Sequence, residues 1–264
     1  MVVADDLIYD VGFHRGEDTA LYLRKGYRVV AFEANPDLVQ EGTRRFEREL
    51  ADGRLEIVEG AISDSAEERM VFYKHPSMTI WGTTSPEWAE RNGATVTRIE
   101  VPVVRFRDHL TRTGTPYFVK IDIEGADRLC LDALVALNAR PAMLSIESDK
   151  TDFGQLRAEL DALERLGFDK FAAVQQGWIG GRVIRTRTRS GEQFSYRFEP
   201  ESSGGFGDDI DRWRSRAAIE RQYRSIFLRY RLLGDHSLLP HPGIHRIPLL
   251  RRVLPGWYDT HAAR

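Results

Sequence analysis

The sequence predicts an α/β domain built on a doubly wound parallel sheet. Over the first 170 residues, short apolar runs alternate with segments of helical spacing, the order that produces βαβ units. A turn with two glycines, Gly12 and Gly16, joins the first apolar run to the first helical segment. In a doubly wound sheet such a turn lies at the carboxyl ends of the strands, where ligands bind.

The periodicity of the apolar residues gives the expected elements in order. Pro36 suits the first position of a helix because its ring fixes φ, so one helix is expected from Pro36 to about Leu50. Other helices are expected at Asp18–Lys25, at Ala126–Leu137 and over the leucine repeat from Leu156 to Leu166. Strands are expected at Leu7–Val11, Arg28–Phe32, Leu55–Val58, Met70–Tyr73, Ile99–Val104, Tyr117–Ile123, Met143–Ile146 and Phe171–Val174.

The last 90 residues follow a different pattern. Residues 182–189 and 194–198 alternate apolar and polar side chains on either side of a glycine turn, which predicts an antiparallel hairpin. A glycine-rich loop at 203–209 is expected to act as a lid that excludes water. No linker-like stretch isolates this part. We therefore expect a domain over residues 1–200, with residues 201–264 packed on it as a lid and substrate region.

A basic helix is expected from Ile210 to Leu233, because seven arginines interleave with aromatic residues there. Such a helix is compatible with peripheral contact to an anionic membrane, with a phosphate-bearing substrate, or with a solvated face over a packed aromatic side. Four prolines follow it, so the tail is expected to be irregular and packed by Trp257 and Tyr258.

Composition excludes several classes of protein. The formal net charge is -2 and the pI is about 6.4, which gives no global positive field for nucleic acid. The sequence shows no signal peptide and no apolar run of membrane-spanning length. Its one cysteine, Cys130, lies in a helical pattern and is expected to be a core residue. A single cysteine forms no intramolecular disulfide, so a cytoplasmic location is expected.

The turn after the first strand has the spacing DxGxxxG, formed by Asp10, Gly12 and Gly16. The two glycines let the backbone turn sharply and approach a ligand. This is not the GxGxxG spacing that places a pyrophosphate on a helix N-terminus. Asp10 at the strand end would repel a pyrophosphate, whereas it would attract the cationic amino group of S-adenosylmethionine.

Two further carboxylates follow the second and third strands. Glu33 lies about 20 residues after the glycine turn, where a carboxylate can hold both ribose hydroxyls of NAD or of S-adenosylmethionine. Asp64 follows the third strand, where such a turn can supply an acceptor for an adenine amino group. Asp64 is equally suited to a structural turn.

The most informative stretch is Lys120-Ile121-Asp122-Ile123-Glu124-Gly125, in which charged residues alternate with isoleucine in a central strand. Burying such charges without partners is costly, so they must pair with one another or face a wet cleft. Asp122 and Glu124 at the strand end can serve as a general base or anchor a substrate. Glu147 and Asp149 after the next strand open the alternative of Mg²⁺, but further ligands are not assured and we assign no metal.

Together these stretches resemble the FkbM-type methyltransferases, which are S-adenosylmethionine-dependent O-methyltransferases. The resemblance covers about residues 7–150 and rests on Asp10-Val11-Gly12 with Gly16 and Thr19, Phe32-Glu33-Ala34-Asn35-Pro36, and Lys120-Ile121-Asp122-Ile123-Glu124-Gly125. Residues 202–204 and 257–261 look like a subgroup of the same family. The chain departs from the family at Phe13-His14, where Ala-Asn is usual.

The resemblance implies a seven-stranded sheet with an antiparallel last strand, and the hairpin at 182–198 agrees with that. It also implies methylation of a hydroxyl, commonly on a sugar or a polyketide-like natural product. The C-terminal region is then a helical or irregular extension. The acceptor is expected to be a small molecule or glycan, and the oligomeric state is left open.

Under this reading, Gly12, Gly16 and Thr19 belong to the turn beneath the methionine part of the cofactor. Asp10 holds its amino group, Glu33 its ribose and Asp64 its adenine. Displacement at the sulfonium methyl needs an aligned nucleophile and a base for the hydroxyl proton. The candidates for the base are Asp122, Glu124, His14 and His75.

Two other readings compete with methyl transfer. An NAD-dependent oxidoreductase would also use a carboxylate at Glu33, but the chain lacks GxGxxG and any Tyr-x-x-x-Lys pair. The Phe13-His14 departure supports a second alternative, a module that binds S-adenosylmethionine without catalysis.

Overall fold

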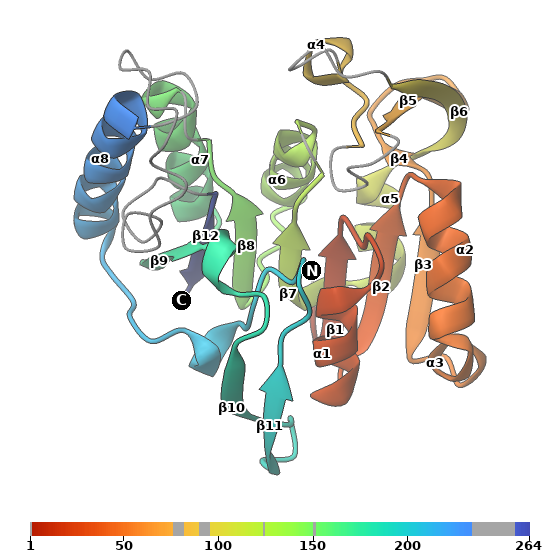
Figure 1. Ribbon diagram of the computed structural model, residues 1–264, viewed down its shortest axis with the longest axis horizontal. Helices are drawn as coiled ribbons and strands as arrows, with labels where there is room; N and C mark the ends of the chain where they lie inside the picture. The colour runs from red at the N-terminus through yellow and green to blue at the C-terminus, as the bar shows by residue number, and fades with distance from the viewer. Residues whose placement is uncertain (1, 76–81, 90–95, 124, 150–151, 234–256) are drawn as a thin grey trace.

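The computed structural model describes residues 2–75, 82–89, 96–123, 125–149, 152–233 and 257–264. Seven strands of this part of the chain form the central sheet: β1 (Val3–Val11), β2 (Arg28–Glu33), β3 (Leu55–Glu59), β7 (Thr115–Ile121), β8 (Met143–Glu147), β9 (Lys170–Gln175) and β12 (Tyr258–Ala263). Their order in space is β3-β2-β1-β7-β8-β12-β9 (Figure 1).

The order of the strands reverses beside β1. Strands β2 and β3 lie on one side of it and β7 and β8 on the other, all parallel. Strand β12 then inserts antiparallel between β8 and β9. The predicted doubly wound, seven-stranded sheet with an antiparallel strand is confirmed. Its reversal point predicts a ligand crevice at the carboxyl ends of β1 and β7.

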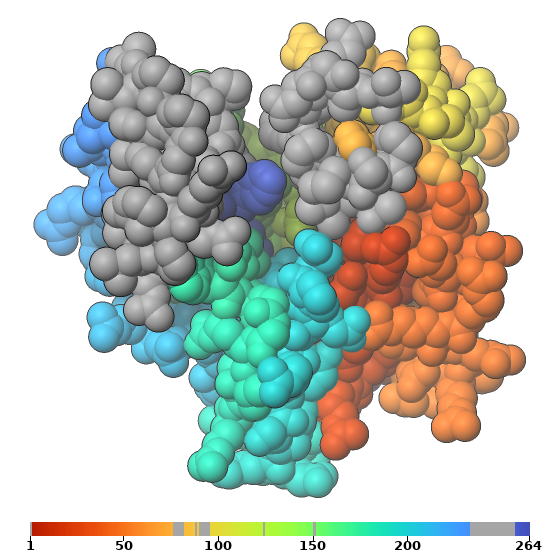
Figure 2. Space-filling view, in the orientation of Figure 1, coloured from red at the N-terminus to blue at the C-terminus, as the bar shows by residue number. Residues whose placement is uncertain are grey.

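The antiparallel strand comes from the tail, where an irregular segment was expected. That expectation was wrong because β12 contains buried polar residues in place of an apolar run. The hairpin does form, as β10 (Val183–Arg187) and β11 (Gln193–Arg197), but these strands make a separate two-stranded sheet. Figure 2 shows the hairpin projecting from the lower end of the molecule. A third sheet contains β4 (Ala61–Ile62), β5 (Arg69–Lys74) and β6 (Thr97–Val104).

Helices cover both faces of the sheet. On one face, α5 (Phe106–Thr113), α6 (Asp127–Ala136), α7 (Phe153–Arg165) and α8 (Arg216–Leu233) share a core with Tyr9 and Val119. On the other face, α1 (Glu17–Arg24) packs on Ile8 and Phe118 together with the hairpin. Because side chains alternate along a strand, Asp10 and Lys120 point to the face that carries α1.

Several boundaries differ from the sequence prediction. The helix expected from Pro36 to Leu50 is divided at Phe46 into α2 (Pro36–Arg45) and α3 (Glu47–Ala51), and the Phe46 ring packs edge-on against Phe13. The basic helix begins at Arg216, six residues later than expected. Helix α5 and the short α4 (Pro86–Ala89) were not predicted. None of the helices in the described part of the chain is long and apolar enough to cross a membrane.

The segment expected to be a lid is instead tied to the domain. The Phe206 ring stacks on Phe118 with centroids 4.4 Å apart and an interplanar angle of 6°. Lys25 and Asp209 form a buried ion pair at 2.5 Å. The hydroxyl of Ser202 donates to an Asp18 carboxylate oxygen at 2.5 Å. These contacts pack residues 202–209 as a wall against α1 and β7 in this structure.

Strand β12 carries a buried histidine that makes stability depend on pH. Burial lowers the pKa of His261 to about 4, below its unfolded value of about 6.5, and no described residue bonds its Nε2 atom. As the pH falls from the unfolded pKa of His261 towards its folded pKa, the unfolded chain binds a proton at this residue and the folded chain does not. We expect His261 to cost roughly 2 kcal/mol of unfolding free energy between pH 7 and pH 5.

Urea denaturation at the two pH values tests this expectation. The His261→Gln variant should lose about 2 kcal/mol less than the wild-type protein over the same interval. The comparison variant is His109→Gln: His109 on α5 is half-buried and burial lowers its pKa as well, so its removal should reduce the loss, but by less than His261→Gln does. Equal losses in wild type and His261→Gln would contradict the assignment.

Candidate functional site

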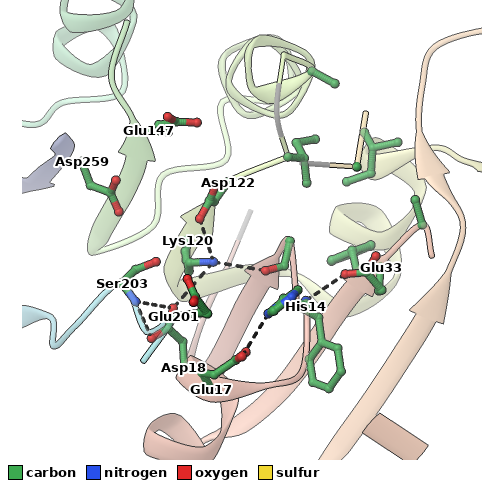
Figure 3. Close-up of a pocket in the computed structure, with 18 of the residues that line it drawn as sticks. His14, Glu17, Asp18, Glu33, Lys120, Asp122, Glu147, Glu201, Ser203 and Asp259 are labelled. Atoms are coloured by element: carbon green, nitrogen blue, oxygen red, sulfur yellow. Dashed lines mark hydrogen bonds and ion pairs between the residues drawn. The ribbon is translucent and has the colours of Figure 1, made fainter. Parts of the chain in front are cut away.

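A pocket of about 300 Å³ opens at the carboxyl ends of the parallel strands. This volume is in the range of small-molecule sites. Figure 3 shows side chains from several strand ends converging on it. Most of the lining residues come from the β1–α1 turn, from the ends of β2, β7 and β8, from residues 60–62 at β4, from residues 200–203 and from the start of β12.

The β1–α1 turn requires its first glycine. Gly12 has φ +93°, and a Cβ atom there would lie 1.9 Å from the backbone oxygen of Asp122. The backbone N–H groups of Gly12 and Phe13 both donate to the carbonyl of Phe32, at 3.1 and 2.9 Å. Three strand ends thus meet at this turn. Gly16, at φ +80°, caps α1 and packs against the rings of Phe13 and Phe46.

The family departure at Phe13-His14 has a structural account. Phe13 is buried against Phe46, so it fills the core behind the turn. His14 adopts φ +53° and lines the pocket, and its Nδ1 atom lies 3.0 Å from a Glu17 carboxylate oxygen. His14 therefore lies at the site, as predicted.

Glu33 organises the turn while it faces the pocket. One carboxylate oxygen accepts from the backbone N–H of His14 and the other from that of Asn35, both at 2.8 Å. Burial raises the pKa of Glu33 to about 6, although these two donors oppose the rise. Each oxygen retains a lone pair, so the fixed carboxylate can still accept hydroxyl donors.

Lys120 on β7 is the centre of the charged floor of the pocket. Its Nζ atom lies 3.6 Å from Asp10, 3.6 Å from Asp18 and 3.4 Å from Asp122, and it donates to the Gly12 carbonyl at 3.2 Å. Burial alone would lower the pKa of Lys120, but the surrounding carboxylates raise it well above its usual range. The Lys120 side chain therefore stays a charged ammonium group. It holds together the ends of β1 and β7 and the start of α1.

Two predicted cofactor residues lie beneath the pocket rather than among the side chains that line it. Asp10 is 0% exposed, and the hydroxyl of Thr19 donates to it at 2.6 Å. Burial raises the pKa of Asp10 to about 6, although Lys120 opposes the rise. The Asp10 carboxylate is enclosed by the fold. It therefore affects the pocket by holding Lys120 in place.

Two other predicted residues do not line the pocket, and a third is not described. Asp64 is exposed and pairs with Arg107 of α5 at 3.3 Å, so the structure does not support its assignment to adenine. His75 follows β5 and is not among the lining residues. Glu124 lies outside the described residues.

Several residues that line the pocket were not among the site residues predicted from the sequence. Asp18 accepts from the backbone N–H of Ser203 at 3.0 Å, which binds the 202–209 wall to α1. Asp259 lines the pocket from β12, and Trp257, which directly precedes that strand, also lines it. Glu147, considered only as a metal ligand, also lines it. Asp18 had a local signal, since acidic residues favour the first turn of a helix, whereas Asp259 was singled out only within the family resemblance of residues 257–261.

The lining is strongly acidic. Among the described lining residues, the carboxylates come from Glu17, Asp18, Glu33, Asp122, Glu147, Glu201 and Asp259, and the lysine is Lys120. Such a lining favours a cationic ligand and disfavours a pyrophosphate. S-adenosylmethionine, with its sulfonium and amino groups, fits this charge, and the bare backbone at Gly12 leaves room for close approach. Among the described residues, no group of three His, Cys, Asp or Glu side chains is arranged to hold a metal ion.

Two of the solved structures with a similar chain path are named as methyltransferases. A precorrin-6Y C5,15-methyltransferase from Geobacter metallireducens GS-15 shares 13% identity, with a TM-score of 0.37 over 74% of this chain and 77% of that one. The O-methyltransferase TomG from Streptomyces achromogenes, in complex with SAM, shares 15%, with a TM-score of 0.33 over 72% and 71%. Likeness this distant carries no argument about function.

No curated protein sequence matches the chain. The family evidence is a match of residues 10–170 to the model of the methyltransferase FkbM domain. This match spans more than half of the chain and includes the glycine turn, Glu33 and the Lys120–Glu124 stretch. The chain therefore belongs to the FkbM methyltransferase domain family, whose methyl donor is S-adenosylmethionine.

Proposed function

We propose that this protein methylates a hydroxyl group on a sugar or natural-product-like small molecule. The observation that carries the proposal is the row of carboxylates from Asp122, Glu147 and Asp259 at one end of the pocket. A hydroxyl is a weak nucleophile until its proton is removed, and carboxylates in a cleft can accept that proton. Trp257, which also lines the pocket, suits stacking on a sugar ring or an aromatic acceptor.

Bound S-adenosylmethionine supplies an electrophilic methyl group on a positively charged sulfur. We assign the ribose hydroxyls to Glu33, whose oxygens are already fixed by two backbone donors. The backbone of Gly12 and the floor at Lys120 are assigned to the methionine part. These contacts would align the acceptor oxygen with the C–S bond.

The acceptor side of the pocket is assigned to the C-terminal region. Ser202, Ser203, Trp257 and Asp259 all line it, and all belong to residues 201–264. This supports the division in which residues 1–200 bind the cofactor and the remainder contributes to the acceptor site. Ser202 and Ser203, at the start of this wall, line the pocket and would limit the entry of water.

The experiment is an incubation of the purified protein with S-adenosylmethionine and a panel of neutral sugars, glycosides and phenolic natural products. Mass spectrometry of the products and release of S-adenosylhomocysteine report turnover, and NMR locates the new methyl group. A methyl ether is expected. A methyl group on nitrogen or carbon would contradict the proposal, whereas binding of the cofactor without turnover on any acceptor would favour a binding module.

A further inference from the structure

Two of the pocket carboxylates differ in their partners. Asp122 pairs with Lys120 at 3.4 Å, and its side chain is 35% exposed. Asp259 is only 3% exposed, and none of the described residues forms a hydrogen bond or ion pair with its carboxylate. A buried polar group normally has a partner. Because Asp259 lines the pocket, a ligand is the partner that this position can receive.

The antiparallel direction of β12 explains how Asp259 reaches the site. An antiparallel strand begins at the edge where its parallel neighbours end, and Asp259 is the second residue of β12. It lies opposite Glu147 of β8 and Val174 of β9. In Figure 3 it faces the pocket from the side opposite Glu33. This is the side that we assign to the acceptor.

Most of the groups around Asp259 are acidic. Lys120 faces it from β7 and Asp122 from directly after that strand, Asp18 and Tyr22 from α1, Asp127 from α6, Glu147 from β8, Glu159 from α7 and Tyr223 from α8. Burial and then the Asp122 carboxylate raise the pKa of Asp259 well above its usual range, and Lys120 opposes the rise. Without a ligand, the carboxyl group therefore tends to hold a proton.

We propose that Asp259 is the catalytic proton acceptor of the methyl transfer, and that binding of the positively charged S-adenosylmethionine displaces its proton. This inference rests on the proposed function. A positive charge brought into the pocket favours the charged carboxylate. The cofactor thus prepares the base that the acceptor hydroxyl requires, and Asp259 holds its proton while the pocket is empty.

The proposed step balances as follows. On cofactor binding, the Asp259 proton passes to solvent. The acceptor oxygen then forms its bond to the methyl carbon while the C–S bond breaks, with the electron pair left on sulfur. The hydroxyl proton passes to the Asp259 carboxylate. S-adenosylhomocysteine leaves as a neutral thioether, so the positive charge that had favoured the ionised carboxylate disappears and Asp259 stays protonated.

Calorimetry tests this proposal without knowledge of the acceptor. Titrations at pH 7 in phosphate and in Tris, two buffers with different ionisation enthalpies, give the number of protons released on binding. S-adenosylmethionine and S-adenosylhomocysteine differ by one methyl group and the positive charge on sulfur. We expect S-adenosylmethionine to release more protons, by up to about one per site, and we expect Asp259→Asn to abolish the difference.

The matched control is Asp132→Asn, because Asp132 lies on the outer face of α6 and pairs with Arg128 at 2.9 Å. It should keep the wild-type difference. Equal proton release by the two ligands in the wild-type protein would overturn the inference, even if Asp259→Asn fails to fold. An unchanged difference in a folded Asp259→Asn variant would also overturn it. If neither ligand binds, the proposed function itself fails.

Discussion

Substitution of Glu33 by alanine is expected to weaken binding of S-adenosylhomocysteine by about 100-fold or more. The wild-type carboxylate is held by the backbone N–H groups of His14 and Asn35, so it is positioned before a ligand arrives. Two hydroxyl contacts to a charged group contribute roughly 1.5–3 kcal/mol each, and about 1.4 kcal/mol corresponds to tenfold in Kd. Isothermal titration with S-adenosylhomocysteine measures the change.

The control for this substitution is Glu59→Ala. Glu59 occupies the corresponding position at the end of β3, directly beside Glu33 in register, but it is exposed and does not line the pocket. It should leave Kd within a factor of about two, as expected for a surface site. Equal effects of the two substitutions would show that the general charge of this edge, and not the Glu33 contact, controls binding.

Gly12→Ala is expected to cost about 4 kcal/mol or more of unfolding free energy. The new Cβ would lie 1.9 Å from the Asp122 carbonyl oxygen, so β1 and β7 would have to separate at their ends. The positive φ of +93° adds strain of about 1–3 kcal/mol for any residue with a Cβ. Thermal denaturation should show Tm falling by about 10 °C or more, with loss of ligand binding.

Gly53→Ala separates the two causes. Gly53 also has a positive φ, +74°, but a Cβ there would meet nothing within 4 Å. It should therefore show only the conformational cost, about 1 kcal/mol or a Tm change of about 2–4 °C. If Gly12→Ala were no worse than Gly53→Ala, the close approach between the two strand ends would not be a constraint on the fold.

The parts of the site that could be predicted from sequence are those whose signal is local. Gly12 and Glu33 each follow an apolar strand directly, so their position at the sheet edge follows from the strand itself. Lys120 stood out because a charge in a buried strand needs partners, and the structure supplies Asp10, Asp18 and Asp122.

The parts that could not be predicted depend on distant segments. Asp64 follows β3 as expected, but its direction is set by Arg107 on a helix with no clear sequence signal. Strand β12 is paired with residues about 100 positions earlier, and its buried Asp259, Thr260 and His261 give no apolar run. Hydrophobic periodicity does not detect a strand whose buried side chains are polar.

The insertion of β12 between β8 and β9 also bears on how the chain folds. No direct pairing joins β8 to β9, so until β12 arrives both strands present unpaired backbone groups. Pairing over so long a sequence separation carries a large loop-closure cost and slows folding. Newly made chains should therefore pass through a state in which β8 is an open sheet edge and β9 is not yet joined to the central sheet, and such exposed strands recruit chaperones or aggregate.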